Sequence, residues 1–141
     1  MVVEKNARPN GIEQRLSKYE PEDVIKEYYK ALDRKDVETV RACWFKKSSS
    51  EWLTANMSDA ELFDDTPSGG IDGGIKNVKS AKCMDVVAGE KNLEEGYWTF
   101  RVDIDMQYVE IITESNGETF FDCRMVLESP KTGWKISSFG R

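Results

Sequence analysis

Apolar and polar residues alternate along one long stretch of the chain, residues 97–112. Side chains of a strand point alternately to its two faces, so this pattern predicts a long strand with one buried face and one polar face. The predicted inward series is Trp98, Phe100, Val102, Ile104, Met106, Tyr108 and Ile112. Any fold for this chain must therefore include a sheet that is covered on one side.

A second alternating stretch follows Asn116-Gly117, a dipeptide typical of a two-residue hairpin turn. Its predicted inward series is Thr119, Phe121, Cys123, Met125 and Leu127. A two-residue turn would set Ile112 opposite Phe121 and would bring the two apolar faces into register. Trp134 and Ile136 continue the inward face in a last strand that ends near Phe139, and an earlier strand is predicted over about 76–88.

The first half of the chain has helical periodicity instead. Val24, Ile25, Tyr28 and Leu32 recur at helical spacing after Pro21, which predicts a helix that ends near Asp33. Only one of Tyr28 and Tyr29 is expected to face inward on it. Asp36 can cap a second helix whose inner face carries Val37, Val40 and Trp44, and Ser58-Asp59-Ala60-Glu61 matches the capping box of a short third helix.

The chain is expected to form one domain. Its 141 residues suit a single core, and residues 1–18, polar and aperiodic, are expected to form a flexible N-terminal arm before a domain over 19–141. The glycine-rich segment 66–74 separates the helical half from the strand half. A phosphate-binding loop would require Lys and then Ser or Thr after Gly74, but Ile75 and Lys76 stand there, so this segment is interpreted as a structural hinge.

These elements predict an α+β fold in which two or three N-terminal helices pack on a strongly curved antiparallel sheet of four or more strands. The order resembles the NTF2-like, or cystatin-like α+β cone, superfamily. The resemblance is carried by residues 21–32, by residues 36–40 and by the terminal run 133–140, whose Gly133-Trp134-Lys135-Ile136 is similar to the last strand of small uncharacterised bacterial members. Some of those members are lipoproteins and are described only as domains of unknown function.

Composition then excludes several function classes. The chain contains no histidine, so a Ser-His-Asp or Cys-His nucleophile and a histidine-ligated metal are excluded. A net charge of −6 argues against a nucleic-acid partner. Cys43, Cys83 and Cys123 form no CxxC motif and are interpreted as small buried residues. No cofactor is expected, and no apolar run is long enough to span a membrane.

One carboxylate interrupts the inward series. Glu110 falls between Tyr108 and Ile112, and the predicted register sets it opposite Cys123. Catalytic members of the superfamily use a carboxylate that lines the cone, so the resemblance makes Glu110 a candidate general base with a tyrosine partner. No catalytic residue of those enzymes can be aligned with this chain. The alternative is that a bulge shifts the register, or that Glu110 lies in water beyond the helices.

Aromatic side chains supply the other candidates. Tyr28, Trp44, Trp98, Tyr108 and Trp134, together with Glu110, are the predicted ligand-pocket residues. Asp103 and Asp105 form an Asp-x-Asp pair on the opposite face, but the calcium-loop motif fails after them, so no metal site is expected. Phe120 and Val126 also point outward, which makes the outer sheet face a candidate homodimer interface.

Three hypotheses follow. The leading one is a non-enzymatic module that binds a small apolar ligand or peptide on the concave aromatic face. The second is a histidine-free isomerase or hydrolyase, similar to ketosteroid isomerase, that uses Glu110 as general base. The third is a structural module at the cell surface. The first residues lack a signal peptide, so the chain as written is expected in the cytoplasm; the alternative is an extracytoplasmic bacterial lipoprotein without its leader.

Overall fold

The protein is an α+β domain, described by a computed structural model over residues 11–46, 57–64, 71, 73–112 and 115–140. The helical elements are α2 (Gly11–Leu16), α3 (Pro21–Arg34), α4 (Val37–Ala42), α5 (Asp59–Asp64) and the 3-10 turn η2 (Ile75–Asn77). The strands are β1 (Val78–Asn92), β2 (Tyr97–Tyr108), β3 (Gly117–Ser129) and β4 (Gly133–Gly140). The predicted fold class, helices before an antiparallel sheet, is confirmed at this level.

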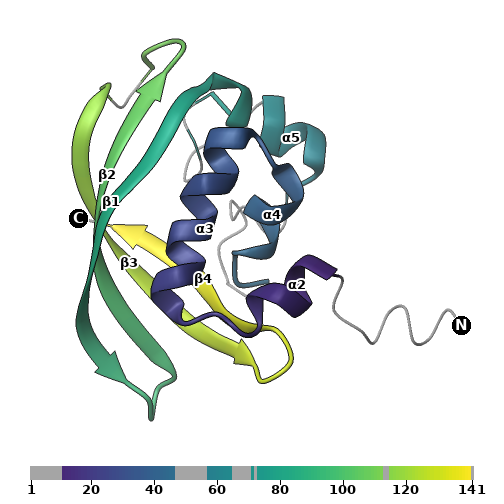
Figure 1. Cartoon of the computed structure of the whole chain (residues 1–141), viewed down its shortest axis with the longest axis vertical. Helices are drawn as coiled ribbons and strands as arrows, with labels where there is room; N and C mark the ends of the chain where they lie inside the picture. Colours follow the sequence, from purple (N-terminus) through teal and green to yellow (C-terminus); the bar gives the residue numbers. More distant parts are fainter. Residues whose placement is uncertain (1–10, 47–56, 65–70, 72, 113–114, 141) are drawn as a thin grey trace, which may run out of the picture.

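The strands form one antiparallel sheet in the order β1-β2-β3-β4. The sheet bows around α3 without closing on itself, and the helices lie together on its concave side (Figure 1). The lower part of the sheet, with the turn between β1 and β2, extends beyond the end of α3. Part of the concave face is therefore covered by a helix and part is not. No helix in the described part of the chain has the length and apolarity needed to cross a membrane.

The helices begin and end where local chemistry allows. Pro21 occupies the first turn of α3, and Lys35 follows the helix in the left-handed region with φ 59°. The Asp36 carboxylate accepts the backbone N–H of Thr39 at 3.2 Å, which confirms the predicted cap of α4. The capping box of α5 is also confirmed, because Ser58 and Glu61 exchange two hydrogen bonds of 3.3 and 3.2 Å.

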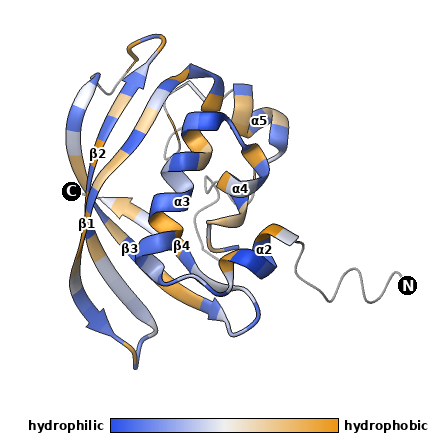
Figure 2. Cartoon of the chain, viewed as in Figure 1, coloured by the Kyte–Doolittle hydropathy of each residue, from blue (hydrophilic) through white to orange (hydrophobic). Residues whose placement is uncertain are grey.

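The expectation that only one of the two helix tyrosines faces inward is wrong. Tyr28 and Tyr29 are both 4% exposed, and their ring centroids lie 5.0 Å apart in an edge-to-face arrangement. The prediction assumed a helix with one covered side. Helix α3 instead lies inside the curve of the sheet (Figure 2), and it contacts both edge strands, β1 and β4, as well as α4, so its apolar residues are covered on more than one side.

The alternating pattern is confirmed in the middle of the sheet and fails toward its ends. The buried part of the predicted inward series is Phe100, Val102, Ile104, Met106, Cys123, Met125 and Ile136. Ile112 is 58% exposed and Leu127 is 49% exposed, so the prediction that both are buried is wrong. Strand β2 ends at Tyr108, before Ile112, and a register irregularity follows Leu127 in its pairing with β4.

The predicted two-residue hairpin is also wrong. Met106 pairs with Gly117 and Val102 pairs with Phe121, so the connection between β2 and β3 is much longer. The Asn116 side chain accepts the backbone N–H of Tyr108 at 2.7 Å instead of occupying a tight turn. The true pairing differs from the predicted one by an even number of residues, which keeps each side chain on its predicted face.

Two segments of the first half differ from expectation. Residues 1–10 of the predicted arm lie outside the described residues, while residues 11–16 form α2, in which Leu16 is fully buried. Helix α4 ends at Ala42, so Trp44 does not lie on it. Trp44 makes a parallel bridge with Ile136, supported by a 2.8 Å hydrogen bond from the Phe45 N–H to the Ile136 carbonyl. This segment covers the outer edge of β4.

Candidate functional site

Two of the predicted pocket residues belong to the core. Tyr28 and Trp44 are 4% and 3% exposed, and both pack on Phe139 with ring centroids 5.7 Å away. Phe121 reaches the same ring from β3 at 6.0 Å. Burial raises the pKa of Tyr28 well above its ordinary value, so the hydroxyl stays protonated throughout the physiological range. In this region the concave face is filled by side chains of the protein itself.

Two other predicted residues meet where β2 and β4 begin. Trp98 and Trp134 are half-buried, and their rings lie 6.1 Å apart in an edge-to-face arrangement. The Lys91 ammonium lies 3.9 Å from the centre of the Trp98 ring, a cation–π contact. Leu127, which pairs with Trp134, is 49% exposed. We call Trp98, Trp134, Leu127 and Lys91 the hairpin-end cluster.

The remaining two predicted residues lie at the opposite end of β2. Tyr108 is half-buried and is the last residue of the strand, whereas Glu110 lies beyond it with an exposed side chain. The backbone of Glu110 is held by one side chain: Asn77 accepts its N–H and donates to its carbonyl, both at 2.9 Å. Asn77 is 7% exposed and fixes this turn from η2.

The predicted position of Glu110 opposite Cys123 is wrong. Cys123 pairs with Phe100, and Glu110 follows the end of β2 instead of continuing its inward series. The general-base hypothesis places this carboxylate inside the cone, whereas the structure leaves its side chain exposed beyond the end of β2. The six predicted residues thus separate into three places: a core pair, the hairpin-end cluster, and the far end of β2.

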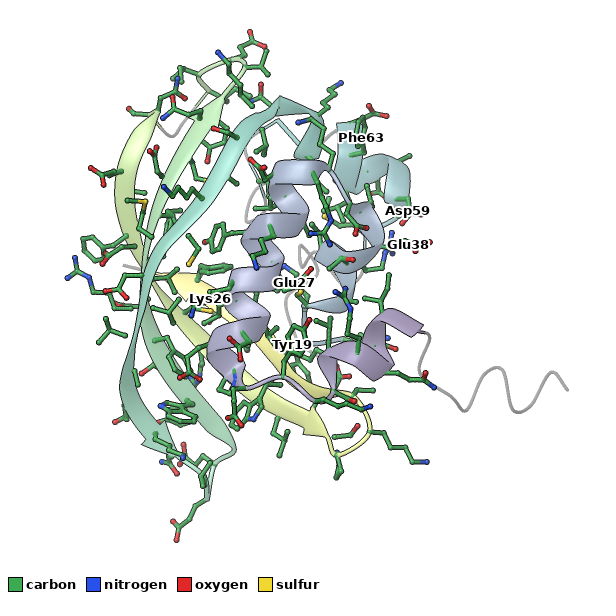
Figure 3. The ribbon with its side chains drawn as sticks, in the orientation of Figure 1. Tyr19, Lys26, Glu27, Glu38, Asp59 and Phe63 are labelled. Atoms are coloured by element: carbon green, nitrogen blue, oxygen red, sulfur yellow. The ribbon has the colours of Figure 1, made fainter. Side chains whose placement is uncertain are left out.

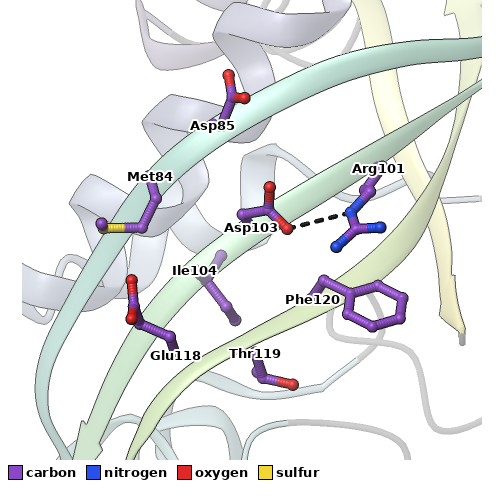
Figure 4. A pocket seen from close by; sticks show the side chains of 8 residues that line it. All are labelled: Met84, Asp85, Arg101, Asp103, Ile104, Glu118, Thr119 and Phe120. Carbon is purple, nitrogen blue, oxygen red and sulfur yellow. Dashed lines mark hydrogen bonds and ion pairs between the residues drawn. The ribbon is translucent and has the colours of Figure 1, made fainter.

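The outer face of the sheet carries charge and a shallow hollow (Figure 4). Arg101 forms an ion pair of 3.2 Å with Asp103, and its guanidinium lies 4.2 Å from the centre of the Phe120 ring. Asp105 accepts a hydrogen bond of 2.9 Å from Gln107. Within the described ranges, no three potential metal-ligating side chains converge here or elsewhere. The Asp-x-Asp pair is engaged by its neighbours on the sheet.

Sequence reasoning missed a buried lysine. Alternation between Trp134 and Ile136 predicts that Lys135 points to solvent, but its side chain is fully buried. Its Nζ donates to the backbone carbonyl of Ala42 at 2.6 Å and lies 3.9 Å from a carboxylate oxygen of Glu13. Burial lowers the pKa of Lys135 below its ordinary value. Nothing in the local sequence marks this residue.

A basic hollow between α3 and β1 was also missed. Its volume is about 200 Å³, and it is lined by Lys26, Lys30, Ala81, Lys82 and Cys83. Cys83 is half-buried, unlike the fully buried Cys43 and Cys123, so the prediction that all three cysteines are buried is wrong for this one. The sequence pattern that could have predicted this hollow is the spacing of Lys26 and Lys30, which lie four residues apart on one helix.

The fold and the sites described above define a small α+β domain with a filled core and a half-exposed aromatic end. Residues 22–140 match the model of the family described as "Domain of unknown function (DUF4829)", and the chain belongs to that family. No curated protein and no solved structure matches the chain. The description of this family assigns no activity to the domain.

Proposed function

We propose that this protein is a non-enzymatic binding module with an NTF2-like fold, and that its hairpin-end cluster holds a small apolar ligand or the apolar side chains of a peptide. The NTF2-like assignment is supported by helices that lie inside the curve of an antiparallel sheet. The observation that carries the function is the half-buried Trp98–Trp134 pair, whose rings lie 6.1 Å apart where β2 and β4 begin.

The position of this pair supports binding over a purely structural role. Ligand sites combine apolar walls with a few polar groups, and aromatic rings offer large rigid contact areas. The cluster provides two indole rings, the exposed Leu127 side chain and one cation, Lys91. The covered middle offers no such surface, because Tyr28, Trp44 and Phe139 pack on one another there.

The enzyme alternative has less support. A general base requires a carboxylate held close to the reacting group, and the Glu110 side chain is exposed at the end of β2 opposite to the tryptophan pair. The absence of histidine removes the residue that most often performs proton transfer at neutral pH. A structural module, the third hypothesis, predicts that the cluster binds no ligand.

A neutral apolar dye tests the proposal. Nile red should bind the purified chain saturably and gain fluorescence, and tryptophan emission should change with the same midpoint. Trp134→Ala should weaken binding about tenfold, the equivalent of about 1.4 kcal/mol of lost contact. Phe120→Ala, which removes an exposed aromatic from the outer face, is the matched control and should bind as the wild type does.

Two results would contradict the proposal. Equal affinity of wild type and Trp134→Ala would place the dye elsewhere. A lack of saturable binding by a folded wild-type chain would favour the structural module. Circular dichroism on each variant separates lost binding from lost folding.

We also propose that the outer sheet face pairs two copies of this chain. Three exposed apolar side chains support this, namely Met84, Val87 and Phe120, which accompany the Arg101–Asp103 ion pair on the same face. A face with both charge signs can complement itself across a two-fold axis. Sedimentation equilibrium should report a dimer in the wild type and a monomer for Phe120→Glu. A monomeric wild type at high micromolar concentration would exclude this interface.

A further inference from the structure

The side chains that α3 places beside the edge strand β1 change from acidic to basic along the helix. Near the end of the helix, the Asp33 carboxylate accepts the backbone N–H of Ala81 at 2.9 Å. The Lys35 ammonium donates to the Val78 carbonyl at 2.6 Å. Side chains at the end of the helix thus satisfy backbone groups on the free edge of β1, and an anion occupies the place in front of the Ala81 amide.

The same edge continues past Ala81. Among the described strands, β1 has a neighbour on one side only, and its pairing with β2 is regular from Ala81, opposite Met106, to Cys83, opposite Ile104. In a regular strand the N–H groups of alternate residues point to the same side. The Cys83 N–H therefore lies on the free edge, about 7 Å beyond that of Ala81.

The helix presents the opposite charge at this second position. Lys30 precedes Asp33 by about one turn of α3, and Lys26 lies one turn earlier again. Figure 3 places Lys26 on the side of α3 that faces β1. Within the described residues neither ammonium lies within ion-pair distance of a carboxylate, although the chain carries a net charge of −6. Like charges one turn apart are unfavourable in a helix, which a bound anion would relieve.

We propose that the hollow between α3 and β1 binds the oxyanion of a small molecule, a phosphate or a carboxylate group, which accepts the Cys83 N–H and is held by the charges of Lys26 and Lys30. The bound group would repeat at Cys83 the arrangement that Asp33 makes at Ala81. This site is separate from the hairpin-end cluster, since the β1 partner of Trp98 is Lys91, eight residues beyond Cys83. It therefore stands or fails independently of the function proposed above.

The Cys83 thiol supplies a reporter inside the hollow. Cys43 and Cys123 are fully buried, so a neutral thiol reagent such as N-ethylmaleimide should label Cys83 first in the folded chain. The experiment measures the labelling rate against increasing inorganic phosphate, and separately against acetate, with sodium chloride holding the ionic strength constant. Protection should saturate, with labelling about threefold slower when the anion concentration is about twice its dissociation constant.

Charge variants identify the site. The double variant Lys26→Gln with Lys30→Gln should lose the protection, whereas Lys131→Gln, which removes an exposed lysine from the turn between β3 and β4, should retain it. The single variant Lys26→Gln should show an intermediate effect. Protection by phosphate alone would assign a phosphate ligand, and protection by acetate as well would assign a general oxyanion site. Equal labelling rates with and without either anion, or equal protection in the double variant, would overturn the proposal.

Discussion

Phe100 and Trp98 are neighbours in one inward series, with ring centroids 5.0 Å apart, yet they lie in different environments. Phe100 is 1% exposed and belongs to the hydrophobic core. Trp98 is half-buried near the start of β2, where its ring contacts Trp134 and Lys91. Alternation therefore specifies which face a side chain points to, while the groups that pack on each part of that face decide whether it becomes core or candidate binding surface.

The largest expected difference between the two regions is in stability. Phe100→Ala leaves a cavity in a filled core and should lower the free energy of unfolding by about 3–5 kcal/mol. Trp98→Ala should lower it by about 1–2 kcal/mol, because a half-buried ring loses less contact and the space opens to solvent. Urea unfolding followed by circular dichroism measures both values. Equal losses would mean that the hairpin end is as much core as the middle.

The buried Cys43 and the half-buried Cys83 should differ in how strongly they make the stability depend on pH. Burial raises the pKa of Cys43 from 9.0 to about 12. The unfolded chain releases this proton from about pH 9 while the folded chain keeps it, so stability falls as pH rises from 9 toward 12, by up to about 1.4 kcal/mol per pH unit. In urea unfolding between pH 8 and 11, Cys43→Ala should reduce this slope. Cys83→Ala, at the half-buried position, should change it less; the reverse order would contradict the assigned burial.

The next prediction concerns the turn that follows β2, where the inward apolar series ends. Asn77 holds the backbone of Glu110 with two hydrogen bonds of 2.9 Å, so Asn77→Ala should cost about 1–3 kcal/mol of stability. Hydrogen exchange should rise at the Glu110 amide in the variant. An unchanged exchange rate there would show that the turn is held by other contacts.

The smallest effect is expected for the Glu110 side chain itself. Glu110→Gln should change stability by less than about 0.5 kcal/mol, since the carboxylate is exposed. Nile red affinity should also stay unchanged. A loss of ligand binding or of any turnover in Glu110→Gln would restore the general-base hypothesis and would reverse the ranking of the two ends of β2.

Local chemistry made much of the fold predictable. The Asp36 cap and the Ser58–Glu61 capping box each depend on groups within three residues, and both predictions are confirmed. The inward series in the middle strands also followed from the sequence, because a period of two survives any even shift in register. These features do not depend on contacts with residues distant in the sequence.

The burial of side chains by residues distant in the sequence could not be predicted in the same way. The Asn116-Gly117 signal was local, but the Asn116 side chain instead accepts the Tyr108 N–H, and the strands separate before the predicted turn. The burial of both Tyr28 and Tyr29 depends on the curvature of a sheet formed by later residues. The pairing of Trp98 with Trp134 joins two strands that are not neighbours, β2 and β4, so no pattern along the chain could specify it.

The buried Lys135 also has a consequence for how the protein is made. It binds the Ala42 carbonyl, 93 positions earlier in the chain, beside the bridge between Trp44 and Ile136. The helical half leaves the ribosome first, but the strand that completes its packing is synthesised almost a hundred residues later. During that interval Trp44 and Tyr28 lack Phe139, the β4 ring that packs on both of them, so this part of the core stays incomplete until β4 emerges.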